Sequence, residues 1–165
     1  MTEYGQMVRL LVSSGVEFLL VGGVAGIAHG AARATYDLDV VYRRTPENIQ
    51  RLVACLEPYA PYMRGAPPGL PFKFDAETVK RGLNFTLKTS LGDIDLLGEI
   101  LGGGVYEDLI PRAVDAQMFG TQCKCIDLPT LIKTKRAAGR PKDFEAISEL
   151  EALLEMRDKN KHTTS

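Results

Sequence analysis

The stretch Val21–Tyr42, VGGVAGIAHGAARATYDLDVVY, decides the fold. The β-rich run Phe18–Val21 leads into a double glycine, and the later run Tyr36–Tyr42 carries two aspartates at i and i+2. Because side chains alternate between the two faces of a strand, Asp37 and Asp39 must share a face. Two carboxylates held side by side repel each other, so the pair favours a cation between them.

The glycines that precede this pair indicate what else binds here. Gly22 and Gly23 let the backbone approach a bulky anion, and a small-residue helix is expected just behind them over Val24–Ala32. A hard divalent ion, Mg²⁺ or Mn²⁺, prefers oxygen ligands and keeps open positions for phosphates. The first hypothesis is therefore a site for phosphate and metal.

Bulk properties exclude several classes of protein. The chain has 165 residues, which suits one domain with a proper core. A net charge of −1 argues against non-specific coating of nucleic acid. No apolar run approaches the roughly 18 residues of a membrane span, and the start of the chain lacks a signal-peptide pattern. Three cysteines are expected to be reduced, structural thiols in a cytoplasmic protein. No membrane partner is expected.

Apolar spacing and turn residues predict the remaining elements. The proline- and glycine-rich segment Pro58–Pro71 is expected to be a loop, either facing a substrate or simply connecting. Tyr106–Ala116 is expected to be partly helical. Helices are predicted over 6–14, 45–56, about 128–139 and from Pro141 onwards. Strands are predicted over 16–21, 36–42, 72–74, 84–88 and 93–99, the last two as a hairpin, with an edge strand pair over 117–126.

A second acidic pair lies on the later strand of that hairpin. Asp93 and Asp95 also stand at i and i+2 and share a face. If this strand neighbours the strand of Asp37, three or four carboxylates converge and could hold one or two metal ions. The plainer alternative is that paired aspartates lie at a solvated edge or in a turn. This alternative is stronger for Asp93 and Asp95 than for Asp37 and Asp39.

With these motifs in place, the chain resembles the nucleotidyltransferase-fold superfamily, which includes DNA polymerase β and the antibiotic nucleotidyltransferases. The resemblance rests on Gly22-Gly23, on Asp37-Leu38-Asp39 and on a third aspartate, for which the apolar-Asp-apolar pattern favours Asp95. It implies an α/β (α+β) fold with a mixed β-sheet flanked by helices and C-terminal helices. The single domain would comprise a core over about 5–126, a helical part over about 128–158 and a polar tail over 159–165.

A narrower resemblance concerns bacterial nucleotidyltransferase-like proteins related to abortive-infection (AbiEii-type) toxins of toxin–antitoxin pairs. It rests on His29-Gly30, on Arg33-Ala34-Thr35 and on the tract 135–143, KRAAGRPKD. It implies that Arg33 and Thr35 lie at the nucleotide site. It also implies that Lys135 contacts the triphosphate, with Asp143 nearby.

Each of these residues has a plainer alternative. The basic residues around Lys135 could form a solvated face of a helix. Arg33 could make an ordinary ion pair. His29 is more often a packed, hydrogen-bonded histidine than a catalytic base.

The resemblance implies a metal-dependent enzyme that transfers NMP from an NTP to an acceptor hydroxyl. Asp37 and Asp39 would bind the metal, Asp95 would be the general base or a second-metal ligand, and the two glycines would hold the β- and γ-phosphates. The acceptor would be RNA or tRNA, a protein or a small molecule, and a cognate antitoxin is a further expected partner.

One departure from the family pattern favours a rival hypothesis. Val24 and Ala25 follow the glycines, where relatives carry a polar residue, often serine. The rival is a catalytically silent module of the same fold that acts by binding. A Rossmann-type dinucleotide site fits poorly, because the glycine spacing differs and such a site has no use for Asp-x-Asp.

Overall fold

A computed structural model describes residues 2–33 and 35–163, so Ala34 of the predicted Arg33–Thr35 motif and the last two residues of the tail lie outside the described residues. The α-helices are α1 (Tyr4–Ser13), α2 (Gly22–Ala28), α3 (Pro46–Leu56), α4 (Ala76–Arg81), α5 (Tyr106–Leu109), α6 (Leu128–Ala138) and α7 (Pro141–Thr163). A short 3₁₀ turn follows α3, and another follows α5. No helix in this described part is long and apolar enough to cross a bilayer.

A seven-stranded mixed sheet forms the centre of the molecule, and a two-stranded ribbon of β6 and β7 lies outside it. The strand order in the sheet is β3-β4-β5-β2-β1-β9-β8. The strands are β1 (Phe18–Val21), β2 (Asp37–Tyr42), β3 (Tyr62–Met63), β4 (Asn84–Thr89), β5 (Gly92–Leu97), β6 (Glu99–Ile100), β7 (Gly104–Val105), β8 (Ala113–Met118) and β9 (Thr121–Ile126). The predicted mixed sheet flanked by helices is therefore confirmed.

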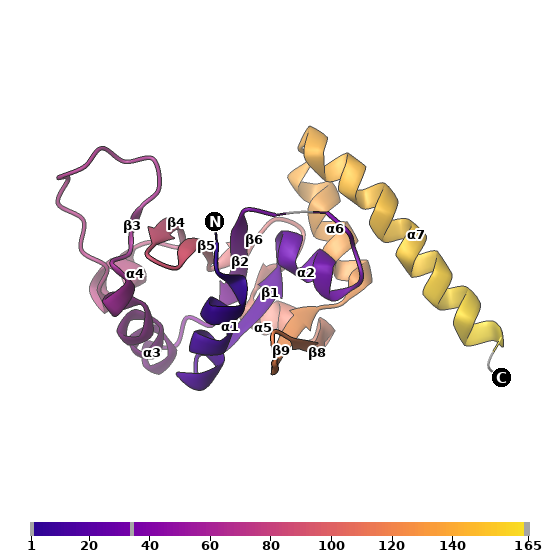
Figure 1. The fold of residues 1–165 in the computed structure, drawn as a ribbon, viewed down its shortest axis with the longest axis horizontal. Helices are drawn as coiled ribbons and strands as arrows, with labels where there is room; N and C mark the ends of the chain where they lie inside the picture. Colours follow the sequence, from indigo (N-terminus) through magenta and orange to yellow (C-terminus); the bar gives the residue numbers. More distant parts are fainter. Residues whose placement is uncertain (1, 34, 164–165) are drawn as a thin grey trace.

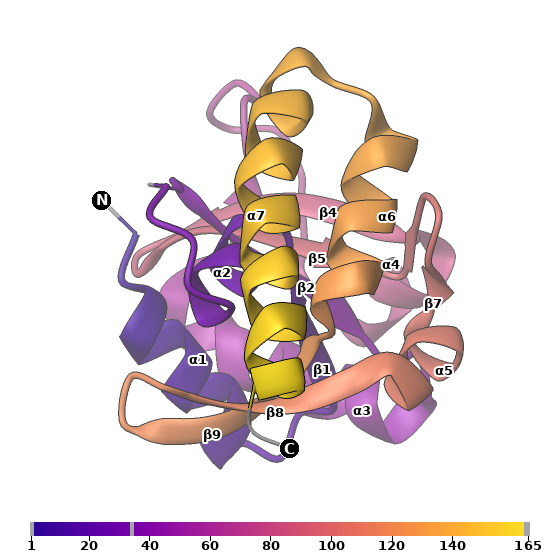
Figure 2. The same ribbon diagram turned by 90° about the vertical axis from the view of Figure 1, so that its right-hand side faces the viewer.

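Helices cover both faces of the sheet. In Figure 1, α1, α3 and α4 lie on one side, and α2, α6 and α7 lie on the other, with α7 outermost. Figure 2 shows α7 and α6 side by side in front of α2 and the central strands. Strand β1 is buried along its whole length, as expected for a central strand covered from both sides.

The central strands bring the two acidic pairs together. β2 is antiparallel to β1 but parallel to β5, and the register sets Asp37 opposite Asp93 and Asp39 opposite Asp95. Between the aspartates, Leu38 is fully buried on the other face of β2. Side chains of the Asp-x-Asp motif thus alternate between the two faces of β2, as the sequence predicts.

Local sequence explains where the helices on the site side begin and end. Asp127 caps α6, because its carboxylate accepts a hydrogen bond from the Thr130 N–H at 2.9 Å. Gly139 ends α6 in the left-handed region at φ +65°, which glycine adopts without strain. Pro141 then opens α7, so the two helices form the antiparallel pair seen in Figure 2.

Four predictions need correction. Phe72–Phe74 is not a strand: Phe74 is buried as part of an irregular segment, and the helix α4, capped by Asp75, follows it. The segment Pro58–Pro71 is not entirely a loop, because it contains β3. The strand pair at 117–126 extends further, to Ala113, because β8 pairs with β9 over six residues. Only β8 of this pair is an edge strand, since β9 also pairs with β1.

Candidate active site

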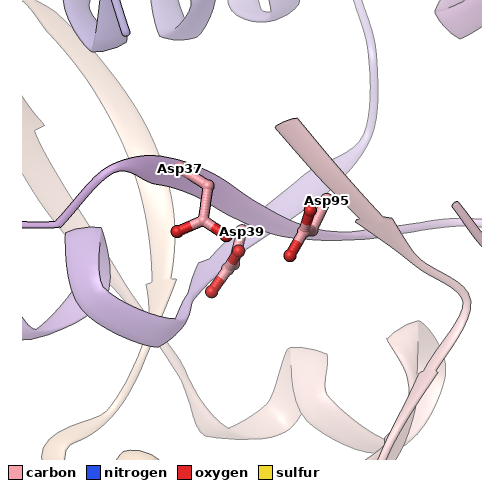
Figure 3. Close-up of side chains that lie close together, drawn as sticks. All are labelled: Asp37, Asp39 and Asp95. Atoms are coloured by element: carbon pink, nitrogen blue, oxygen red, sulfur yellow. The ribbon is translucent and has the colours of Figure 1, made fainter. Parts of the chain in front are cut away.

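Three carboxylates converge on one point above the sheet. Asp37 and Asp39 project from β2, Asp95 projects from β5, and Figure 3 shows all three on the same side of the two strands. One oxygen of each lies within 4.8 Å of the oxygens of the other two. The strand neighbourhood on which the sequence hypothesis depended is therefore present, and Asp95 rather than Asp93 completes this triad.

The cluster is electrostatically strained without a cation. Burial, with further repulsion from Asp37 and Asp95, raises the pKa of Asp39 to about 8. Burial and the charge of Asp37 also raise the pKa of Asp95, and Arg64 opposes this rise. Burial of mutually repelling carboxylates is stabilised by a positive ion.

The triad fits a hard divalent metal ion. Asp39 Oδ1 is buried and has no hydrogen-bond partner, although buried acceptors are normally satisfied. A set of three carboxylate oxygens is the donor chemistry that Mg²⁺ and Mn²⁺ prefer. Asp37, Asp39 and Asp95 are therefore the residues that could hold the predicted ion.

The double glycine lies directly against this cluster, and a larger residue would not fit at either position. A Cβ built on Gly22 would stand 2.1 Å from Asp39 Oδ2, and the backbone has φ +65°. A Cβ on Gly23 would stand 2.7 Å from the side chain of Thr35. The glycines thus let β1 and α2 approach the end of β2 that carries the aspartates.

All nine residues predicted for the site line one cavity of about 370 Å³ between β2, α2, α6 and α7. They come from four separate parts of the chain, up to 121 positions apart, so the fold brings together what the sequence lists separately. They are Gly22, Gly23, Arg33, Thr35, Asp37, Asp39, Asp95, Lys135 and Asp143.

Cations on the helical side face the carboxylates across this cavity. Burial is the main cause that lowers the pKa of Lys135, while Asp143 and Asp39 oppose it. Burial disfavours ionisation of Asp143, but hydrogen bonds from Arg140, including one of 2.8 Å from Nε to Oδ2, hold its pKa below the ordinary value. Lys135 is thus partly buried within the cavity, whereas the basic residues around it, Lys133, Arg136, Arg140 and Lys142, are exposed as expected for a solvated face.

Two predicted residues are found in the plainer of their two roles. Arg33 lines the cavity and makes ion pairs of 3.3 Å with Glu145 and 4.0 Å with Glu149 on α7. His29 is buried: its Nε2 lies 2.7 Å from the Ile126 carbonyl oxygen, and Arg157 Nη1 lies 3.0 Å from its Nδ1. His29 therefore packs α2 against β9 and α7.

Sequence reasoning missed Arg64. This residue follows β3, inside the segment expected to be a loop, and its guanidinium reaches the acidic cluster. Nη2 lies 2.9 Å from Asp95 Oδ1, Nε lies 3.4 Å from Asp93 Oδ2, and Nη1 lies 3.7 Å from Asp37 Oδ2. No local motif marks it, because its placement depends on the pairing of β3 with β4.

A second cavity of about 250 Å³ opens on the other side of Asp39. It shares Gly22, Asp39, Lys135 and Arg140 with the first cavity. Its remaining walls are mainly apolar and come from the ends of β1 and β5, the β6–β7 region and α6. They include Val21, Leu97, Ile100, Leu101, Leu131 and Ala138. Of the three carboxylates, Asp39 alone lines both cavities.

A larger cavity, of about 710 Å³, lies away from the carboxylates. It is lined by residues of α2, β8, α6 and the later part of α7, among them His29 and Arg157. None of Asp37, Asp39 and Asp95 lines it. Size alone therefore does not identify the site.

Comparison with known proteins supports the fold. No family model matches the chain, and no curated protein matches it by sequence. Among solved structures, it is similar to the lincosamide antibiotic adenylyltransferase LnuA with lincomycin bound, with a TM-score of 0.62 and 16% identity over 92% of this chain and 96% of that one. It is also similar to TM1012 from Thermotoga maritima, a protein assigned as a nucleotidyltransferase, with a TM-score of 0.52 and 12% identity over 99% and 96%.

These likenesses extend over nearly the whole of each chain, and at such low identity they concern the fold alone. The element order, the mixed sheet and the paired C-terminal helices agree with what the sequence motifs implied. The chain has the nucleotidyltransferase fold.

Proposed function

We propose that this protein is a metal-dependent nucleotidyltransferase that transfers NMP from an NTP to an acceptor hydroxyl. The observation that carries the proposal is the convergence of Asp37, Asp39 and Asp95 beside Gly22 and Gly23 in one cavity. The cavity supplies carboxylates for a cation on one wall and cations for phosphates on the other. Such a distribution of charge suits phosphoryl-type chemistry, which depends on positioning and on charge neutralisation.

Each residue has a role that its position supports. Asp37 and Asp39 would hold Mg²⁺ or Mn²⁺, with Asp95 as a further ligand or as the general base. The ion, when bound, would neutralise phosphate charge and polarise the reacting phosphorus. Gly22 and Gly23 would admit the β- and γ-phosphates close to the backbone. Lys135 would contact the triphosphate as a point charge.

The proposed step conserves atoms and charge. The acceptor oxygen forms a bond to the α-phosphorus while the bond between that phosphorus and the α–β bridging oxygen breaks. Pyrophosphate leaves with this bonding pair. The proton of the acceptor hydroxyl passes to Asp95 or to water.

The two cavities on either side of Asp39 suggest separate places for the substrates. The polar cavity, with Lys135 and Arg140, suits the NTP. The apolar cavity suits the acceptor, which would be RNA or tRNA, a protein or a small molecule. LnuA shares the fold and is a lincosamide antibiotic adenylyltransferase, so small molecules belong among the acceptors to be tested.

The test is transfer of an α-labelled nucleotide. Purified protein is incubated with each of the four α-³²P-labelled NTPs and Mg²⁺ or Mn²⁺, together with total tRNA, with a protein mixture or with lincomycin. We expect labelling of one acceptor class, loss of labelling in EDTA and loss in Asp39→Ala. The matched control is Asp115→Ala, which alters an exposed aspartate paired with Lys124 at 3.0 Å on the outer strands. Transfer that persists in Asp39→Ala would refute the assignment.

A catalytically silent binding module is the second candidate. Val24 and Ala25, where relatives carry a polar residue, are fully buried core residues that offer no hydroxyl to a phosphate. Such a module could act as the toxin or as the partner protein in an abortive-infection (AbiEii-type) toxin–antitoxin pair, and as a toxin it would bind an antitoxin. Calorimetry separates the candidates, because Mg²⁺-dependent NTP binding supports the enzyme, and its absence from a folded protein supports the module.

A further inference from the structure

A guanidinium occupies one side of the acidic cluster. Arg64 contacts three of the four aspartates that share this face of β2 and β5, and its hydrogen bond of 2.9 Å to Asp95 is the shortest of these contacts. The remaining aspartate, Asp39, forms no ion pair with Arg64. Its Oδ1 has no hydrogen-bond partner among the described residues. The cluster therefore has a side filled by Arg64 and a side that lies open at Asp39.

The position of Arg64 is fixed by the neighbouring strand. Its backbone N–H donates to the Thr86 carbonyl at 2.9 Å, and its Nη2 also donates to the Leu87 carbonyl at 2.8 Å. Both carbonyls belong to β4, which pairs with β5. A planar guanidinium held at both its backbone and its head presents its N–H groups to carboxylates in a fixed direction.

The filled side of the cluster has the properties of a second cation position. Asp93 and Asp95 lie on β5 beside Asp37, and three carboxylates so placed would otherwise repel one another. Arg64 supplies the positive charge of its guanidinium to these three carboxylates. Arg64 does not line the first cavity, whose cations on the helical side include Lys135 and Arg140.

We propose that Arg64 is a positioning residue that orients Asp95 and takes the place of a second divalent ion. The nucleotide-free protein then holds a single divalent ion on the side of Asp39, and Asp37, whose Oδ2 contacts Arg64, is shared between the two sides. This inference rests on the proposed function only in taking the cluster to be a metal site. Nucleotide and acceptor play no part in it.

The test is the stoichiometry of Mn²⁺ binding to the full chain without nucleotide, measured by electron paramagnetic resonance and calorimetry. We expect one ion per chain for the wild type. Arg64→Gln should bind two ions, with the first bound at least about tenfold more tightly, because a neighbouring positive charge has been removed. Arg81→Gln is the matched control, since Arg81 forms an ion pair of 3.1 Å with the exposed Glu77, within the first and last turns of α4.

A second variant keeps the inference testable if Arg64→Gln folds poorly. Asp93→Asn removes an acidic partner of Arg64 and should still bind one ion with an affinity within about threefold of the wild type. The double variant Arg64→Gln/Asp93→Asn should return to one ion. Circular dichroism checks the fold of each variant.

Two results would overturn the inference. One is two ions bound by the wild type, and the other is a folded Arg64→Gln that matches Arg81→Gln in both stoichiometry and affinity. Failure of the proposed function looks different: one bound Mn²⁺ without any nucleotide transfer would refute the enzyme and leave the role of Arg64 standing. Nucleotide transfer by a wild type that binds two ions would support the enzyme and refute the role of Arg64.

Discussion

Replacing Asp39 by asparagine should stabilise the metal-free protein at neutral and alkaline pH. The asparagine side chain has nearly the same shape but carries no charge, so it removes the cost of burying the Asp39 charge and its repulsion by Asp37 and Asp95. The same change removes a proposed metal ligand. Asp39→Asn should therefore gain stability in EDTA and lose metal-dependent stabilisation in Mn²⁺.

The magnitude follows from the raised pKa. Asp39 has a pKa of about 8 in the folded protein against an ordinary value of 3.8. The folded state thus binds the proton more tightly, so wild-type stability falls as pH rises from about 4 to about 8 and stays low above that. Full ionisation would cost up to about 6 kcal/mol. Because side chains and water relax around the charge, we expect Asp39→Asn to be more stable by about 2–4 kcal/mol at pH 8.5.

The assay is urea unfolding in EDTA at pH 4.5, 6.5 and 8.5, followed by circular dichroism. The stability difference between Asp39→Asn and wild type should be small at pH 4.5 and largest at pH 8.5. Addition of Mn²⁺ at pH 8.5 should stabilise the wild type and leave the variant almost unchanged, because the ion replaces the proton in neutralising the cluster. A wild type more stable than Asp39→Asn in EDTA at pH 8.5 would refute the reasoning.

Three further changes probe the glycines, the cation and the C-terminal helix. Gly22→Ala should destabilise the protein by at least about 2 kcal/mol in chemical unfolding, because its Cβ would overlap Asp39 at a backbone φ of +65°. It should also weaken Mn²⁺ binding in calorimetry. Lys135→Met should weaken NTP binding by about 10–100-fold, with Mn²⁺ binding retained, because it removes only the phosphate contact. Arg157→Ala should cost about 1–3 kcal/mol and speed hydrogen exchange in α7, because Arg157 holds His29 by bonds of 3.0 Å to Nδ1 and to the carbonyl oxygen. A stability unchanged in Gly22→Ala or Arg157→Ala, or an NTP affinity unchanged in Lys135→Met, would contradict the role given to that residue.

The sequence predicted the part of the fold that local patterns determine. The Asp-x-Asp motif required only the alternation of a strand. Gly22 was predicted to let the backbone approach an anion, and it lies against the Asp39 carboxylate of the next strand. Gly139 and Pro141 marked the turn between α6 and α7. Each of these features is determined by a few neighbouring residues.

The sequence could not reveal what depends on pairing between distant strands. Arg64 contacts Asp95 only because β3 adds to the edge of the sheet beside β4, and a two-residue strand among prolines has no periodic pattern to detect. Phe72–Phe74 was misread as a strand because its aromatic residues have high β-propensity. Phe72 instead packs edge-to-face on Tyr62, with ring centroids 6.1 Å apart. The Asp75 cap of α4 was the signal that could have corrected this prediction.

The convergence of distant residues lay between these two cases. That Lys135 and Asp143 would lie near the aspartates followed from family resemblance alone. The structure brings them to the same cavity through the packing of α6 and α7 over α2. Arg33, from the same resemblance, lines this cavity too, with its guanidinium paired with Glu145 and Glu149 of α7.

The central claim is that Asp37 and Asp39 form a metal-dependent nucleotide site. Calorimetry of the wild type with each of the four NTPs, in Mg²⁺ and in EDTA, tests it most directly. The account predicts that at least one NTP binds in Mg²⁺, that EDTA abolishes this binding, and that Asp37→Asn loses it while remaining folded. Equal NTP binding in EDTA, or no binding of any NTP by the folded wild type in Mg²⁺, would contradict it.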